Sequence, residues 1–225
     1  MPESTRVLLW TDTPTAYLEA IAAAGLSGRV AVETLARKDP PNAEQRANVA
    51  AMLALSAPAG LLPTMAKLRW IQGLTAGIEG WLALPDLPPG LALTSARGTH
   101  RESMPENILG ALFHITKPYA AIVDDNKAAT WTRRMATPLN GKTLGILGLG
   151  AIGQDLARMA TAIGLRVIGT RRTPGDLPGV AQVYAPAETT EVLQQSDYLV
   201  VLLPSTPATD NSVNAAMLTQ MKPGA

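Results

Sequence analysis

Six residues in the second half of the chain, Gly148–Gly153 (GLGAIG), have the types and spacing of a phosphate-binding turn, G-x-G-x-x-G. An apolar run, 144–147, precedes them, and a helical pattern follows. Gly148 permits a tight turn out of a strand, Gly150 lets the backbone approach a pyrophosphate, and Gly153 lets the helix pack closely against the sheet. The sequence therefore predicts a dinucleotide-binding βαβ unit. A glycine-rich turn without a ligand is the alternative.

Two arginines stand where the second strand of this unit should end. The predicted strand 165–170 runs into Arg171 and Arg172, and no carboxylate follows until Asp176. A carboxylate at this point binds the ribose hydroxyls of NAD and repels the 2′-phosphate of NADP, whereas arginine binds phosphate. The two arginines therefore favour NADP(H), with NAD still possible. Two solvated loop arginines are the alternative interpretation.

The first hundred residues alternate between short apolar runs and helical patterns, which predicts a parallel sheet covered on both faces. A helix is predicted after Pro14, closed by Gly25, and further helices at 61–68 and 78–84. The predicted strands are 6–10, 30–35, 49–55, 69–74 and 91–95.

A long helical stretch follows Ser95. Pro105 suits a first helical turn, and Pro118 is expected to kink or split the helix. An apolar stripe on 105–116 is compatible with a dimer contact and equally with packing inside one domain. His114 falls within that stripe and is expected to be packed or interfacial, whereas His100 stands at the entry to the helix.

A second α/β unit begins after Pro138. It holds the βαβ unit, a helix at 188–195, a strand at 198–204 and a helix at 215–220. The predicted fold class is α/β, with two doubly wound parallel-sheet domains. We place a substrate domain at 1–100 and an incomplete dinucleotide-binding domain at 101–225.

Composition excludes several classes of protein. The 225 residues hold 19 Lys+Arg and 18 Asp+Glu, a net charge of +1, which disfavours a nucleic-acid binder. Cysteine is absent, so disulfides and Cys-ligated metals are excluded, and no metal-ligand spacing is recognised. No long apolar run predicts a membrane span or a signal peptide, so the expected location is the cytoplasm.

The chain resembles the D-isomer-specific 2-hydroxyacid dehydrogenases. The resemblance rests on residues 139–172 and 197–225, on WIQGLTAGIEGW (70–81) and on RGTHRESMPE (97–106). It implies a flavodoxin-like first domain and a Rossmann second domain. It also implies roles for single residues. Ala151 and Ile152 would lie under the pyrophosphate, Leu203, Pro204 and Thr209 would line the cofactor, and the N–H groups of Ala76 and Gly77 would bind the substrate carboxylate. Arg171 occupies the position at which the family has an acidic residue that selects NAD. This difference from the family pattern favours NADP.

No catalytic residue is assigned within this chain. In the family a catalytic Arg, Glu and His follow the last matched segment, so we expect the 225 residues to be part of a longer chain. The strand 198–204 would then be an exposed edge with the composition of a buried central strand.

The resemblance implies an oxidoreductase that transfers a hydride between NADP(H) and a small 2-keto or 2-hydroxy acid, such as glyoxylate or hydroxypyruvate. It also implies a homodimer. The alternative is a non-catalytic regulatory protein of the same fold that senses dinucleotides. A homocysteine-releasing hydrolase with the same turn is disfavoured by the segment LLPSTPATD, 202–210.

Overall fold

The computed structural model describes residues 4–225, which divide into two compact units. The first unit spans 1–97 and the second 98–225, so residues 98–100 belong with the second unit. Each unit is described by itself.

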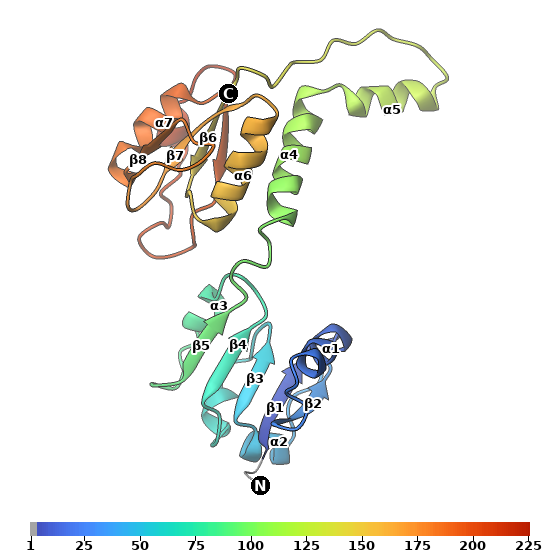
Figure 1. Ribbon diagram of the computed structural model, residues 1–225, viewed down its shortest axis with the longest axis vertical. Helices are drawn as coiled ribbons and strands as arrows, with labels where there is room; N and C mark the ends of the chain where they lie inside the picture. Colours follow the sequence, from blue (N-terminus) through green and yellow to red (C-terminus); the bar gives the residue numbers. More distant parts are fainter. Residues whose placement is uncertain (1–3) are drawn as a thin grey trace. The chain divides into compact units, whose positions relative to one another are not determined.

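The N-terminal unit is a five-stranded parallel sheet in the order β2-β1-β3-β4-β5 (Figure 1). This is the flavodoxin-like order, so the expected fold class is confirmed. Its elements are β1 Thr5–Trp10, α1 Thr15–Ala23, β2 Val30–Leu35, α2 Ala43–Asn48, β3 Ala51–Ala54, η1 Leu62–Thr64, β4 Trp70–Gly73, α3 Glu79–Leu82 and β5 Ala92–Ser95.

One helix prediction for this unit was wrong, and one helix was not predicted. The helix predicted at 61–68 is only the 3-10 turn η1, because the backbone leaves the helical region at Met65, which has φ −97° and ψ 79°. Helix α2 was missed because AEQRAN has no apolar stripe. Its signal was the capping box, in which the Asn42 side chain accepts from the Gln45 N–H and the Gln45 side chain accepts from the Asn42 N–H.

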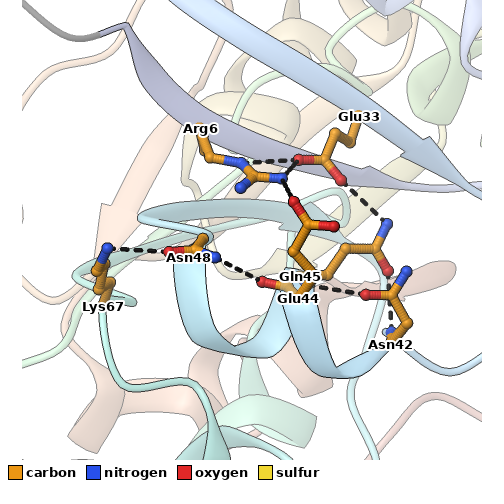
Figure 2. Close-up of polar contacts among 7 residues, drawn as sticks. All are labelled: Arg6, Glu33, Asn42, Glu44, Gln45, Asn48 and Lys67. Carbon is orange, nitrogen blue, oxygen red and sulfur yellow. Dashed lines mark hydrogen bonds and ion pairs between the residues drawn. The ribbon is translucent and has the colours of Figure 1, made fainter.

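A polar network takes the place of apolar packing where α2 lies against β1 and β2 (Figure 2). The Arg6 guanidinium donates to Glu33 Oε1 at 2.6 Å and to Glu44 Oε1 at 3.2 Å. Gln45 Nε2 donates to the other oxygen of Glu33 at 3.3 Å. These carboxylates raise the pKa of Arg6. The network ties a helix of polar sequence to the sheet through charged hydrogen bonds.

The C-terminal unit is a four-stranded parallel sheet in the order β8-β7-β6-β9. In chain order this is 3-2-1-4, as in a Rossmann domain. Its elements are α4 Ser103–Thr116, α5 Tyr119–Lys127, β6 Thr143–Leu147, α6 Ala151–Ala162, β7 Arg166–Thr170, β8 Gln182–Tyr184, η2 Pro186–Glu188, α7 Thr189–Gln195, β9 Tyr198–Val201 and α8 Ala215–Leu218.

Helices cover both faces of this second sheet. Neighbouring strand residues point to opposite faces, and they fall into different cores. Ile146 packs in a cluster with Leu156 of α6, whereas Leu147 packs in a cluster with Val192 of α7. The two faces of the sheet are therefore covered by different helices, as in a doubly wound fold. Strand β9 forms the edge of the sheet in the described residues, and Val201 is exposed there.

The long helical stretch is split as expected at Pro118, between α4 and α5. Leu109 and Leu112 of α4 are buried in the same cluster as Leu156, and α4 lies beside α6 (Figure 1). The buried part of the stripe is therefore used inside this unit. His114 is exposed, so it does not pack inside the unit, and the alternative that it lies at an interface stays a prediction.

Candidate dinucleotide-binding site

The glycine-rich turn joins β6 to α6 and is shaped by close backbone contacts. Gly148 has φ +104°, a conformation that favours glycine. A Cβ at Gly148 would lie 2.8 Å from the carbonyl oxygen of Leu202, and one at Gly153 would lie 2.5 Å from the carbonyl oxygen of Gly148. A Cβ at Gly150 would meet nothing within 4 Å. Two of the glycines are therefore required by the fold, and Gly150 faces open space.

The N-terminus of α6 can accept an anion. Gly150 is its N-cap residue, no side chain caps the helix, and no acidic residue lies in its first turn. The first N–H groups of a helix have no partner within it, and the helix dipole adds partial positive charge. Ala151 and Ile152, which were expected to lie under a pyrophosphate, are the first two residues of this helix. These features fit a phosphate group.

The end of β7 is tied directly to the glycine turn. The N–H groups of Gly148 and Leu149 donate to the carbonyl oxygen of Thr170 at 3.3 and 2.8 Å. Arg171 and Arg172 come next in the chain. Both side chains are exposed, and neither has an ion-pair partner within residues 4–225. Two free guanidinium groups therefore follow the strand that contacts the turn.

The loop after β9 lies against the same turn. A Cβ at Gly148 would be 3.2 Å from the backbone nitrogen of Leu203. Thr209 Oγ1 donates to the carbonyl oxygen of Pro204 and accepts from the N–H of Thr206 at 3.0 Å, which holds this loop in a folded conformation. The structure thus brings the loops of the expected cofactor residues together at the carboxyl ends of β6, β7 and β9, the usual ligand edge of such a sheet.

The two expected substrate residues, Ala76 and Gly77, lie in the N-terminal unit, in the loop after β4. Within residues 4–225 neither N–H donates a hydrogen bond to the protein. Thr75 Oγ1 donates to the carbonyl oxygen of Gly77 at 2.6 Å and shapes the loop. Sequence reasoning missed Glu79, whose carboxylate would meet a Cβ on Gly77. This carboxylate opposes a second anion at the loop.

Comparison with known proteins identifies the family of this chain. A model of the D-isomer specific 2-hydroxyacid dehydrogenase, NAD binding domain, matches residues 109–225. The chain belongs to the D-isomer specific 2-hydroxyacid dehydrogenase family. The resemblance drawn from the sequence is confirmed.

Solved members of this family share the fold. A family protein from Aeromonas salmonicida subsp. salmonicida A449 is 28% identical, with a TM-score of 0.86, over 99% of this chain and 71% of that chain. An NADPH-dependent glyoxylate/hydroxypyruvate reductase from Sinorhizobium meliloti, solved in complex with NADP and sulfate, is 28% identical, with a TM-score of 0.78, over 97% of this chain and 68% of that chain.

Curated 2-hydroxyacid dehydrogenase relatives are longer than this chain. Glyoxylate/hydroxypyruvate reductase A of Serratia proteamaculans is 27% identical over 208 residues, which is 90% of this chain and 66% of that protein. Glycerate dehydrogenase of Methylorubrum extorquens is 28% identical over 141 residues, 59% of this chain and 42% of that protein. The chain therefore spans about half the length of such relatives.

A second polar feature of this dehydrogenase-family domain was not expected from the sequence. Arg101 Nε contacts Asp155 Oδ2 of α6 at 2.6 Å, and Arg101 also donates to Asp155 Oδ1 at 3.3 Å. The guanidinium lowers the pKa of Asp155. The pair lines a cavity of about 660 Å³ beside α4 and α6, together with Glu102, Glu106 and Arg158. The two arginines and three carboxylates that line this cavity largely neutralise one another.

His100 and His114 are both exposed, and the described residues hold no group of three or more side chains that could ligate a metal. In the same part of the chain, no helix has the length and apolar composition needed to cross a bilayer.

Proposed function

We propose that this chain is the substrate-domain and dinucleotide-domain part of an oxidoreductase that transfers a hydride between NADP(H) and a small 2-keto or 2-hydroxy acid, such as glyoxylate or hydroxypyruvate. Family membership supports a 2-hydroxyacid dehydrogenase. The observation that carries the NADP preference is the pair of free guanidinium groups, Arg171 and Arg172, at the end of β7 where no carboxylate lies.

In this proposal the chain's residues bind and orient the cofactor. Gly148, Gly150 and Gly153, with Ala151 and Ile152, would hold the pyrophosphate at the N-terminus of α6. Arg171 and Arg172 would bind the 2′-phosphate, and Leu203, Pro204 and Thr209 would line the nicotinamide side. When bound, NADPH supplies the hydride. The N–H groups of Ala76 and Gly77 would bind the substrate carboxylate. This requires the flexible Glu79 side chain, whose carboxylate lies against Gly77, to turn away.

The cofactor preference is tested by titrating the chain with NADPH and NADH. We expect NADPH to bind at least ~10-fold more tightly than NADH, and Arg171→Ala and Arg172→Ala each to weaken NADPH binding with little effect on NADH. A charged hydrogen bond is worth about 1.5–3 kcal/mol, and 1.4 kcal/mol corresponds to tenfold in affinity. Arg166→Ala, which removes an exposed arginine at the other end of β7, is the matched control. Tighter binding of NADH would contradict the proposed preference.

The reaction is tested on the full-length gene product by following NADPH oxidation with glyoxylate and hydroxypyruvate. Turnover supports the reductase. Tight NADPH binding without turnover over a panel of 2-keto acids would favour the alternative, a non-catalytic protein that senses dinucleotides.

We also propose a homodimer. The apolar arm, which we define as α5 and the segment 128–137, holds several large exposed hydrophobic side chains, and α5 has no buried residue. Trp131 is 93% exposed and Met135 is 81% exposed. Large exposed apolar side chains gathered on one segment are typical of protein–protein contacts, and a second copy of the chain would cover them.

A further inference from the structure

The N-terminal unit holds a cavity of about 630 Å³ that none of the proposed functional residues lines. It lies among the loops that follow β1, β2 and β3, and its wall includes Trp10, Asp12, Arg37, Lys38 and Ser56. In the order β2-β1-β3, the direction of the connections reverses between β1 and β3. Open α/β sheets bind ligands outside the carboxyl ends of their strands at such a reversal.

The walls of this cavity are held by hydrogen bonds between the loops. Trp10 Nε1 donates to the carbonyl oxygen of Ala36 at 3.0 Å. The Arg37 N–H donates to Asp12 Oδ1 at 2.9 Å, and the Thr11 N–H donates to the carbonyl oxygen of Leu35 at 2.9 Å. These bonds join the end of β1 to the loop after β2. The loops that form the cavity wall are therefore held in place by the protein itself, which lowers the entropic cost of binding a ligand.

The cations at this cavity are free to bind an anion. Within residues 4–225, the side chains of Arg37 and Lys38 have no ion-pair partner, and both are exposed. Arg6 of the same unit, in contrast, is held by Glu33 and Glu44. Asp12 is the one carboxylate among the lining residues, and one of its oxygens already accepts the Arg37 N–H.

The remaining lining groups complete a site for an oxyanion with a small apolar body. Ser56 adds a hydroxyl group, and Trp10, Leu55 and Pro58 supply apolar wall. A guanidinium, an ammonium and a hydroxyl together can donate several charge-assisted hydrogen bonds to a phosphate or a carboxylate.

We propose that this cavity is a binding site for a small organic anion, a phosphate or a carboxylate on a short apolar body, held by Arg37, Lys38 and Ser56. The site lies wholly within the N-terminal unit and does not depend on the proposed reaction.

The test is a titration of the ¹⁵N-labelled full chain, at constant ionic strength, with phenyl phosphate, benzoate and uncharged benzyl alcohol. We expect saturable shifts of the backbone amides of residues 12, 37, 38 and 56 and of the Trp10 indole with at least one of the two anions. Saturation by phenyl phosphate alone identifies a phosphate site, and saturation by benzoate alone identifies a carboxylate site.

The controls separate a built site from general attraction to positive charge. The double variant Arg37→Met/Lys38→Met should bind the anion at least ~10-fold more weakly, as expected when charge-assisted bonds are lost. Arg29→Met/Arg69→Met removes the same charge next to the opposite ends of β2 and β4 and should bind as the wild type does. Ser56→Phe, which fills the cavity from an exposed position, should also abolish saturation.

The proposal is overturned if neither anion gives saturable shifts, if benzyl alcohol gives the same shifts, or if the Arg37/Lys38 variant binds like the wild type. NADPH binding to the same variant, which uses the other unit, is expected to be unchanged. Failure of this proposal is thereby distinguishable from failure of the proposed function.

Discussion

Gly148 and Gly150 stand two residues apart in the glycine turn, yet their surroundings differ. Gly148 combines φ +104° with a backbone oxygen 2.8 Å from its would-be Cβ. Gly150 has φ −79° and open space at the same position. The fold requires the first glycine, whereas only a ligand would require the second.

We therefore expect Gly148→Ala to destabilise the C-terminal unit by about 1–3 kcal/mol, the cost of a strained backbone conformation. Gly150→Ala should leave stability within about 0.5 kcal/mol of the wild type, as a substitution without strain does. It should nevertheless weaken NADPH binding strongly, because its methyl group enters the space that a pyrophosphate would approach. Thermal unfolding and NADPH titration of both variants check this. Undiminished NADPH binding by Gly150→Ala would contradict the proposed cradle.

Sequence reasoning at the residue scale found groups that are close in the chain and missed groups that meet through folding. The turn 148–153 is one continuous segment, so the spacing of its glycines alone predicts a phosphate-binding turn. Arg37 and Ser56 line one cavity from loops after different strands. No sequence spacing encodes such contacts.

At the scale of elements, apolar periodicity predicted most strands and the βαβ unit, because buried strands of a parallel sheet are continuously apolar. The prediction failed where an element is polar or short. Strand β8 has only three residues, Gln182–Tyr184, and was not recognised. Helix α2 is held to the sheet by Arg6 and Glu33 rather than by an apolar stripe.

Asp197 fastens the edge strand β9 to its neighbour β6. Its Oδ2 accepts the Thr143 N–H at 2.7 Å, its own N–H donates to the carbonyl oxygen of Thr143 at 2.9 Å, and its Oδ1 contacts Lys222 Nζ at 3.0 Å. The Thr143 N–H, and then the Lys222 ammonium, lower the pKa of Asp197. The charged form is therefore the one that stabilises the fold.

Because the native pKa of Asp197 is lowered, its contribution is full above the unfolded pKa of about 3.9 and is lost as the pH falls through the native value. We expect Asp197→Asn to lower the free energy of unfolding at neutral pH by about 1 kcal/mol, the net worth of a typical hydrogen bond. This difference should shrink below about pH 4. Urea unfolding, followed by the amide signals of β6 and β9 at several pH values, measures it.

Asp210→Asn serves as the control, because the Asp210 carboxylate is exposed and makes no hydrogen bond within residues 4–225. A difference between wild type and Asp197→Asn that stays constant or grows on acidification would show that the Asp197 carboxylate does not act through its charge.

At the scale of the whole molecule, the apolar arm is the surface that we propose for self-association. Leu109 and Leu112, two residues of the apolar stripe on 105–116, are buried in the core of their own unit. Trp131 and Met135 of the arm are left exposed, on a segment that Arg134 ties to α5 through Asp125 at 2.8 and 2.9 Å. We therefore place the proposed dimer contact on the arm rather than on α4.

We expect the full chain to sediment as a dimer, and Trp131→Ser/Met135→Ser to weaken dimerisation at least ~10-fold, because buried aromatic anchors carry much of the energy of an interface. Leu18→Ser/Leu82→Ser removes two exposed apolar side chains of the other unit and should leave the dimer intact. Sedimentation velocity over a range of concentrations distinguishes these outcomes. A wild-type chain that stays monomeric throughout, or an arm variant that dimerises as tightly as the wild type, would place the contact elsewhere or exclude it.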